Sequence, residues 1–304
     1  MRHEDRTTTG MWGVFELRSA FQPIFGFHDG KLAVDAFEGL IRPSRNGDPV
    51  SPAHFFQSLA ADDRLPVETL TRTLHLLNAG EFLDPKTMLF VNLDPSVLGR
   101  RRASEEALRA MRLVLDEAGI EPARVVCEIT EQRSASRVAL ADFVSALRGH
   151  GFRIAVDDYG AEESGMERVT ALKPDIVKFD ARWVARLMHS SPGFALLTTM
   201  VKEFASRGIR TVLEGIEEGR QLALAEEAGA DMVQGYALAE PQTAPTGFAL
   251  FGRDAARPPR RHGNPASLPP GIRAAGAPSL PDMAASFRIR RHAAGRTFGR
   301  RIAS

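Results

Sequence analysis

Short apolar runs alternate with longer segments of helical spacing along the first 250 residues. The runs are rich in Val, Ile and Phe and are bounded by turn residues, which is typical of β-strands. The strands expected from this pattern are 20–25, 32–40, 88–92, 125–128, 153–157, 176–179, 211–214 and 232–234. Eight strands separated by helical segments predict a closed barrel of parallel strands.

The segments between these strands carry apolar residues at helical spacing, and several begin after Ser or Pro and end at Gly. Such residues favour the first turn and the end of a helix. The expected helices are 53–61, 67–82, 105–117, 136–148, 163–172, 192–206 and 218–228. The predicted fold class is therefore α/β, a TIM-like (β/α)8 barrel.

The periodicity ends near Phe251, where Pro, Ala, Gly and Arg become dominant. Residues 251–304 carry eleven arginines against two aspartates, so the formal net charge of +1 hides an acidic body and a basic tail. We expect a flexible N-terminus at 1–10, the barrel at 11–250 and a disordered Arg- and Pro-rich tail at 251–304. The tail is a candidate contact for a protein or anionic-surface partner, and the acidic body argues against a nucleic-acid domain.

The single cysteine, Cys127, lies in an apolar run and has no partner for an internal disulfide, which fits a reducing compartment. No segment reaches the roughly 18 consecutive apolar residues of a membrane span, so we expect a cytoplasmic protein without a transmembrane segment. The sequence contains no Gly-rich nucleotide fingerprint, Walker loop or nucleophile elbow.

Polar residues occupy the carboxyl end of nearly every expected strand. In a parallel barrel these ends open onto one face, where the active sites of this architecture lie. The residues are Glu38, Asn92, Glu128, Asp157, Asp158, Lys178, Glu214 and Gln234. One such residue is usually a solvated cap or a turn, but repetition on successive strands favours a shared site.

Five carboxylates at one mouth would raise each other's pKa values and cost folding energy unless cations neutralised them. Oxygen-only ligands favour Mg²⁺ or Mn²⁺ over zinc. The adjacent Asp157 and Asp158 suit a two-metal hydrolysis centre, because one side chain can bridge both ions while the next reaches only one. Lys178 would stay protonated and position an attacking water or counter the charge of a phosphate.

The sequence resembles the EAL domain of cyclic di-GMP phosphodiesterases over roughly residues 11–241, starting with Phe21-Gln22-Pro23-Ile24 on the first strand. The other motifs, in chain order, are Phe37-Glu38-Gly39-Leu40 with Arg42, Phe90-Val91-Asn92-Leu93, Glu128-Ile129-Thr130-Glu131, Asp157-Asp158-Tyr159-Gly160, Val177-Lys178-Phe179-Asp180, Leu213-Glu214-Gly215-Ile216-Glu217 and Val233-Gln234-Gly235-Tyr236. The resemblance implies a modified barrel that hydrolyses the bacterial second messenger cyclic di-GMP to linear pGpG with two Mg²⁺ or Mn²⁺ ions.

The resemblance also implies roles for individual residues. One ion would be held by Glu38, Asn92, Glu128 and Asp157, and the second ion or its waters by Asp157, Asp158 and Glu214. Lys178 and Gln234 would orient the attacking water, which makes them catalytic together with Glu38 and Glu214. Arg42 would bind a substrate phosphate, Gln22 and Asp180 would lie near a guanine, and Glu131 would steady the loop after the Asp pair. A homodimer is expected from the same resemblance.

Three departures from the family pattern bear on function. Gly39 replaces the alanine of the Glu-Ala-Leu signature at a position that points away from the mouth, and Leu213 replaces a small residue. The loop 161–165 reads Ala-Glu-Glu-Ser-Gly where the family usually carries Gly-Tyr-Ser, which adds carboxylates near the second ion. Two alternatives to the enzyme therefore stay open: a cyclic di-GMP receptor with weak or no turnover that acts through protein partners, and an interaction protein that binds nothing at the mouth. We expect a stand-alone EAL domain, since no cyclase or sensor pattern appears.

Overall fold

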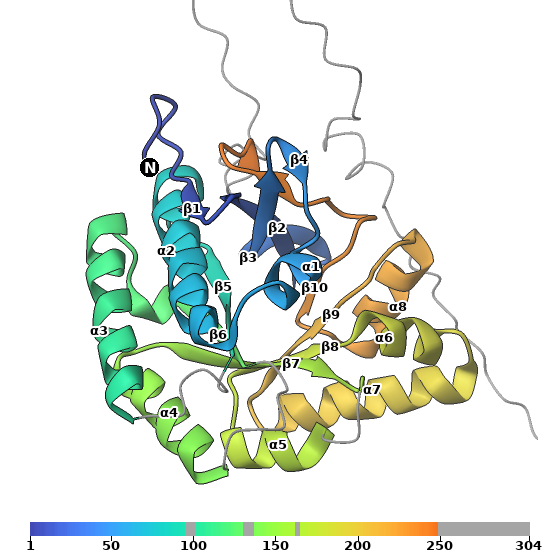
Figure 1. Cartoon of the computed structure of the whole chain (residues 1–304). Helices are drawn as coiled ribbons and strands as arrows, with labels where there is room; N and C mark the ends of the chain where they lie inside the picture. Colours follow the sequence, from blue (N-terminus) through green and yellow to red (C-terminus); the bar gives the residue numbers. More distant parts are fainter. Residues whose placement is uncertain (95–100, 130–136, 162–164, 249–304) are drawn as a thin grey trace, which may run out of the picture. The chain divides into compact units, whose positions relative to one another are not determined.

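The structure is a computed structural model that describes residues 1–94, 101–129, 137–161 and 165–248 (Figure 1). Its strands are β1 (Gly10–Trp12), β2 (Phe15–His28), β3 (Lys31–Arg45), β4 (Asp48–Pro49), β5 (Met88–Leu93), β6 (Val125–Ile129), β7 (Arg153–Tyr159), β8 (Ile176–Phe179), β9 (Arg210–Leu213), β10 (Met232–Val233) and β11 (Gln242–Thr243). Its helices are α1 (Pro52–Gln57), α2 (Arg64–Phe82), α3 (Arg101–Ala118), α4 (Arg137–Gly149), α5 (Gly165–Leu172), α6 (Ala181–Met188), α7 (Ser191–Ser206) and α8 (Gly219–Ala228), with short 3₁₀ turns at Ala61–Asp63 and Pro122–Arg124.

Eight strands of the described residues close a barrel in the order β2-β10-β9-β8-β7-β6-β5-β3, and β3 then pairs with β2. This confirms the predicted barrel. The strands from β3 round to β10 are parallel, but β2 runs antiparallel to both of its neighbours, β3 and β10. The prediction of an all-parallel barrel is therefore wrong for one strand. The reason is local: Asp29 and Gly30, both with positive φ, form a two-residue hairpin turn between β2 and β3, and such a turn joins antiparallel strands.

Strands β2 and β3 are the longest of the sheet, with 14 and 15 residues, and continue past the barrel as a ribbon that β1 and β4 extend at its edges. One face of this ribbon is covered by α1 and α2, in dark to light blue in Figure 1. The covered face carries Leu17 and Ile41, which pack in one buried cluster with Phe55 of α1 and Val67 of α2. The other face is continuous with the inside of the barrel.

The core has two layers that follow strand alternation. Side chains that point outward from the strands pack beneath the surrounding helices in the largest cluster of the described residues. Side chains that point inward form a smaller apolar plug inside the barrel, made of Ile24, Ala36, Met88, Phe90, Val126, Ala155, Ile176, Val212 and Met232. This plug separates the two ends of the lumen, so groups at the C-terminal ends of the strands form a site that is open on one side.

Most helices agree with the sequence pattern to within a few residues, but α6 was missed. This helix starts immediately after β8 and is only eight residues long. Its N-cap is Asp180, whose Oδ1 accepts a hydrogen bond from the Trp183 backbone N–H at 2.8 Å. Asp180, the last residue of the Val177–Asp180 motif, is thus the single residue between the end of β8 and the start of α6.

Residues 1–10, for which a flexible N-terminus is expected, contact α2 in the structure. Thr7 and Thr9 are buried, and the Thr8 backbone N–H donates to Oδ1 of Asn78 on α2 at 2.8 Å while Asn78 Nδ2 donates back to the Thr8 carbonyl oxygen. The segment is thus anchored to α2 by side-chain hydrogen bonds that no periodicity reveals. The expected tail at 251–304 lies outside the described residues. No helix in the described ranges is both long and apolar enough to cross a membrane.

Candidate active site

The C-terminal ends of the barrel strands bring the predicted polar residues together. Glu38 is on β3, Asn92 on β5, Glu128 on β6 and Lys178 on β8, all at inward-pointing positions. Asn92 and Glu128 are direct register partners of parallel strands. Glu214 and Gln234 follow the last residues of β9 and β10. These residues therefore lie at the same end of the barrel, where Lys178 contacts Glu38 and Glu128 and Gln234 contacts Glu38.

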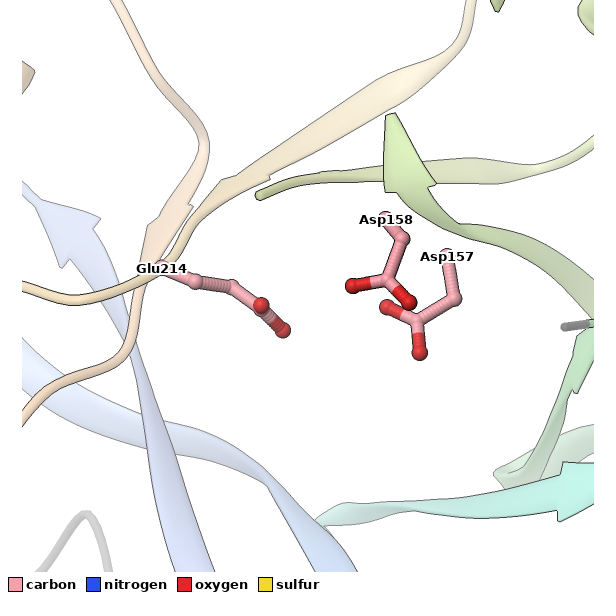
Figure 2. Close-up of side chains that lie close together, drawn as sticks. All are labelled: Asp157, Asp158 and Glu214. Carbon is pink, nitrogen blue, oxygen red and sulfur yellow. The ribbon is translucent and has the colours of Figure 1, made fainter. Parts of the chain in front are cut away.

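A β-bulge lets two consecutive aspartates point to the same side. Val156 and Tyr159 of β7 oppose Val177 and Phe179 of β8, so two β7 residues, Asp157 and Asp158, face the single residue between those partners. Asp158 adopts a φ of 55°, a left-handed conformation that costs energy for a non-glycine residue but that aspartate tolerates better than most. Figure 2 shows Asp157, Asp158 and Glu214 directed toward one another. One carboxylate oxygen from each of them lies within 4.8 Å of the other two. This is the one group of three or more metal-ligating acids found among the described residues.

The ammonium group of Lys178 lies at the centre of four carboxylates. Its Nζ is 2.5 Å from Glu128 Oε1 and 2.7 Å from Glu214 Oε1. It also lies 3.3 Å from Glu38 Oε2 and 3.4 Å from Asp157 Oδ1. Gln234 Nε2 donates to Glu38 Oε2 at 2.9 Å, so the amide and the ammonium hold the same carboxylate oxygen. One cation therefore links strands β3, β6, β7 and β8 and the end of β9.

Burial makes the electrostatics of this cluster strong. Glu128 is fully buried and Lys178 is 1% exposed. Burial raises the pKa of Glu128 well above its ordinary value, against the attraction of Lys178 and with the repulsion of Glu38 and Asp157. The pKa of Lys178 is raised well above its ordinary value, since attraction by Asp157, Glu128, Glu214 and Glu38 outweighs the opposing effect of burial. Lys178 is therefore charged throughout the physiological range.

Glu214 and Asp158, on the open side of the cluster, also have raised pKa values. Burial, and then the charges of Asp157 and Glu38, raise the pKa of Glu214 to about 8 despite the nearby Lys178. Burial and the adjacent Asp157 raise the pKa of Asp158. The protein therefore gathers more negative charge than one lysine neutralises, which is the electrostatic signature of a functional site.

Three buried carboxylate oxygens in the site lack a hydrogen-bond partner: both oxygens of Glu128 and Oδ1 of Asp157. Two of these atoms lie within ion-pair distance of Lys178 Nζ, but none meets hydrogen-bonding geometry. Orphaned buried carboxylate oxygens cost free energy unless a cation or water satisfies them. With Asn92 beside Glu128, the donor set contains only oxygen atoms, which suits a hard divalent cation.

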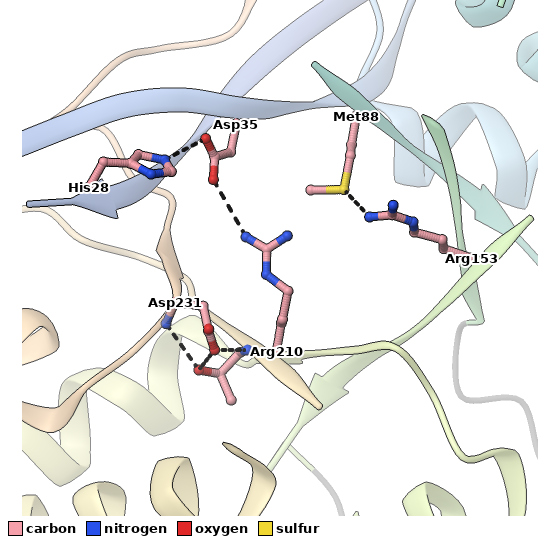
Figure 3. Close-up of polar contacts among 7 residues, drawn as sticks. His28, Asp35, Met88, Arg153, Arg210 and Asp231 are labelled. Carbon is pink, nitrogen blue, oxygen red and sulfur yellow. Dashed lines mark hydrogen bonds and ion pairs between the residues drawn. The ribbon is translucent and has the colours of Figure 1, made fainter. Parts of the chain in front are cut away.

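The opposite end of the barrel carries a polar layer of a different character. Asp35 is buried, accepts from His28 Nε2 at 2.7 Å and lies 3.5 Å from Arg210, while Arg153 donates to the Met88 sulfur at 3.1 Å (Figure 3). Asp35 of β3 thus pairs with Arg210 of β9, and the apolar plug lies between this layer and Lys178. This end therefore fits the stabilising role that the N-terminal face has in barrels.

The remaining predicted residues are placed as follows. Gln22 of β2 is the register partner of Glu38 and is 8% exposed. Arg42 lies four residues beyond Glu38 on β3, and its side chain donates to the carbonyl oxygen of Ile41 at 3.0 Å. Asp180 is engaged as the cap of α6. Glu131 lies outside the described residues.

An aromatic cluster that the sequence pattern does not indicate supports the bulge. Tyr159 follows Asp158, is buried, and packs edge-to-face on Phe179, Trp183 and Phe204 with ring centroids 5.2–5.8 Å apart. Such pairs add stabilisation beyond their buried area. The only sequence signal was an aromatic residue directly after the Asp pair, which by itself is a common pattern.

The family model of the EAL domain matches residues 14–241. Among curated relatives, the probable cyclic di-GMP phosphodiesterase PdeA of Escherichia coli K12 is 28% identical over 210 residues, which is 67% of this chain and 28% of that protein. The cyclic di-GMP phosphodiesterase RocR of Pseudomonas aeruginosa is 32% identical over 155 residues, which is 50% of this chain and 38% of that protein. This chain thus spans less than half of the length of either relative.

Solved structures with a similar fold include two complexes with the dinucleotide. Klebsiella pneumoniae BlrP1, in a manganese and cyclic di-GMP complex, has a TM-score of 0.67 and 28% identity, over 75% of this chain and 56% of that chain. Bacillus subtilis YkuI, in complex with cyclic di-GMP and calcium, has a TM-score of 0.66 and 26% identity, over 78% of this chain and 59% of that chain. With the family model matched over most of the barrel, the chain belongs to the EAL domain family.

Proposed function

We propose that this protein hydrolyses cyclic di-GMP to linear pGpG with the help of divalent cations. The observation that carries the proposal is the cluster of buried, incompletely satisfied carboxylates around Lys178 at the open end of the barrel. Relatives named as cyclic di-GMP phosphodiesterases support the same reaction. The protein would act in the cytoplasm, in bacterial signalling.

The residues of the site fit two Mg²⁺ or Mn²⁺ ions. Glu38, Asn92, Glu128 and Asp157 would hold one ion, because Glu128 and Asp157 contribute the orphaned oxygens. Asp157, Asp158 and Glu214 would hold the second, because their oxygens already converge. When bound, such ions polarise a phosphoryl oxygen and activate water.

The protein's own groups then arrange the reacting atoms. Lys178 keeps the carboxylates in place and supplies a fixed positive charge beside the phosphorus, where negative charge grows during attack. Gln234, which donates to Glu38 through Nε2, keeps its amide oxygen available to orient the attacking water. The water oxygen forms a bond to phosphorus as the bond from phosphorus to the 3′-oxygen breaks, and the proton that the water gives up ends on the departing 3′-oxygen, so that linear pGpG carries a 5′-phosphate and a 3′-hydroxyl.

Substrate orientation would come from side chains above the metal centre. Arg42 would bind a phosphate, and Gln22 and Asp180 would face a guanine. Asp180 uses one carboxylate oxygen for the cap of α6, which leaves the other for a base N–H. Glu131 would steady the loop after Asp158.

The test is a metal-dependent cleavage assay on the purified protein, with linear pGpG separated from the cyclic substrate. We expect product with Mg²⁺ or Mn²⁺, none in EDTA, and a loss of at least 10²-fold in kcat for Glu38→Ala and for Lys178→Ala. Submicromolar binding without product would make the protein a receptor. If the protein neither binds nor cleaves the dinucleotide, it is an interaction protein. Either of these two results would refute the proposed activity.

We also propose a homodimer, as expected from the family resemblance. Sedimentation velocity at micromolar concentration would give about twice the mass of one chain, and a single species at the monomer mass would contradict this part of the proposal.

A further inference from the structure

Two arginines face one another across the β2–β3 ribbon above the mouth. Arg18 of β2 and Arg42 of β3 are register partners. Each lies four residues from the register pair Gln22 and Glu38, or roughly 13 Å along its strand. Because side chains alternate between faces, both arginines lie on the face that carries Glu38. They extend the wall of the candidate active site outward.

The two arginines keep guanidinium donors beyond the contacts that they make within the protein, and the acidic neighbours of Arg18 are Glu16 and Asp5. Arg18 Nε donates to Glu16 Oε1 at 2.9 Å, and the Arg18 side chain is 52% exposed. Arg42 donates to a backbone carbonyl oxygen. Like charges directly opposite one another destabilise a strand pair, and a guanidinium offers further donors on its terminal nitrogens. A fork of donors on two adjacent strands is suited to phosphate oxygens.

We infer that Arg18 is a second substrate-binding residue, which together with Arg42 holds the phosphate of cyclic di-GMP that is not being cleaved. The inference rests on the proposed function, because the dinucleotide supplies two phosphodiester groups. One group lies at Lys178 for attack, and the other needs a positive partner at the rim. The arginine pair thereby favours a ligand with two separate phosphodiester groups over a mononucleotide with one phosphate.

The experiment compares Arg18→Gln with Arg45→Gln by calorimetric titration of cyclic di-GMP in Ca²⁺, the ion present with the dinucleotide in the YkuI complex. Arg45 is exposed and lies three residues beyond Arg42, so it points to the other face of the same ribbon and controls for general loss of charge. We expect Arg18→Gln to raise Kd about tenfold and Arg45→Gln to change it less than about twofold. In the cleavage assay Arg18→Gln raises KM and leaves kcat nearly unchanged.

A second comparison tests whether the two arginines act on one group. Arg18→Gln and Arg42→Gln together should weaken binding less than the product of their separate effects, and Arg18→Lys should recover part of the affinity. The inference is overturned if wild type binds and Arg18→Gln binds equally well, or if Arg45→Gln is as harmful as Arg18→Gln. If wild type itself neither binds nor cleaves, the proposed function fails, and this inference fails with it.

Discussion

Substituting Gly39 by alanine, which restores the family signature, should destabilise this protein. A Cβ atom at Gly39 would lie 2.9 Å from Cγ, 3.1 Å from Cδ2 and 3.2 Å from Cβ of His75. These atoms are near the root of the side chain and cannot swing away. The His75 ring is 4% exposed and is held by Ser19 Oγ, 2.9 Å from Nδ1, so the space is already filled.

Two opposing effects set the magnitude. Overpacking a core costs about 1–3 kcal/mol, whereas replacing a strand glycine by alanine recovers about 0.5–1 kcal/mol of backbone entropy. With both effects near the middle of their ranges, the net loss in unfolding free energy is about 1 kcal/mol, or a melting temperature lower by roughly 2–4 °C for a domain of this size. Because Gly39 follows Glu38, any shift of β3 also displaces a proposed metal ligand.

Urea denaturation of Gly39→Ala, with the slope m unchanged, measures this loss. His75→Ala supplies the matched background: without the ring, the added methyl group should be neutral or stabilising, and the double-mutant cycle should give a coupling energy of about 1 kcal/mol or more. If Gly39→Ala is as stable as wild type, or if its effect is the same in both backgrounds, the steric explanation is refuted.

Three further predictions follow from the charged and buried groups. In EDTA the unfolding free energy should fall as pH rises from about 4.5 to about 8, because burial raises the pKa of Glu68 to about 7 and that of Glu214 to about 8, so the native state binds more protons than the unfolded state in this window. Urea titrations at pH 5.5, 7 and 8.5 check the sign, and a rise would contradict it. Asp158→Asn should keep the melting temperature within a few degrees, since asparagine tolerates the left-handed backbone, but should weaken Mn²⁺ binding about tenfold in a calorimetric titration; unchanged Mn²⁺ affinity would remove Asp158 from the second site. Cys127 is fully buried with its pKa raised to about 12, so a thiol reagent should modify it only in urea, and fast labelling of the native protein would show that β6 opens.

The barrel and the gathering of the site were predictable because both follow from strand periodicity. Glu38, Glu128 and Lys178 end apolar runs, and the architecture brings such ends to one mouth. The signal for the reversed strand was also present, since Asp29-Gly30 between two apolar runs is a strong hairpin pattern.

Other features could not be read from the sequence, for physical reasons. Hydrophobic periodicity indicates which side of a helix or strand is buried, but it does not identify the residues that this side contacts. The close packing of His75 against Gly39 could therefore not be predicted. The bulge at Asp158 breaks the alternation on which strand prediction depends. The side chain of Arg72 is buried on α2 beside Glu68, 3.3 Å away, and the partner that allows this burial cannot be read from hydrophobic periodicity.

The reversed strand β2 also dictates when the site can come into existence during synthesis. The ring closes only when Met232 and Val233 pair with β2, and the Gln234–Glu38 bond spans 196 positions of sequence. Until the ribosome has released β10, the edge of β9 is unpaired, and β2 is paired with β3 but not with its other barrel neighbour, β10. The acidic site is thus assembled late in synthesis, and a nascent chain stalled before residue 232 has no complete site for cations or substrate.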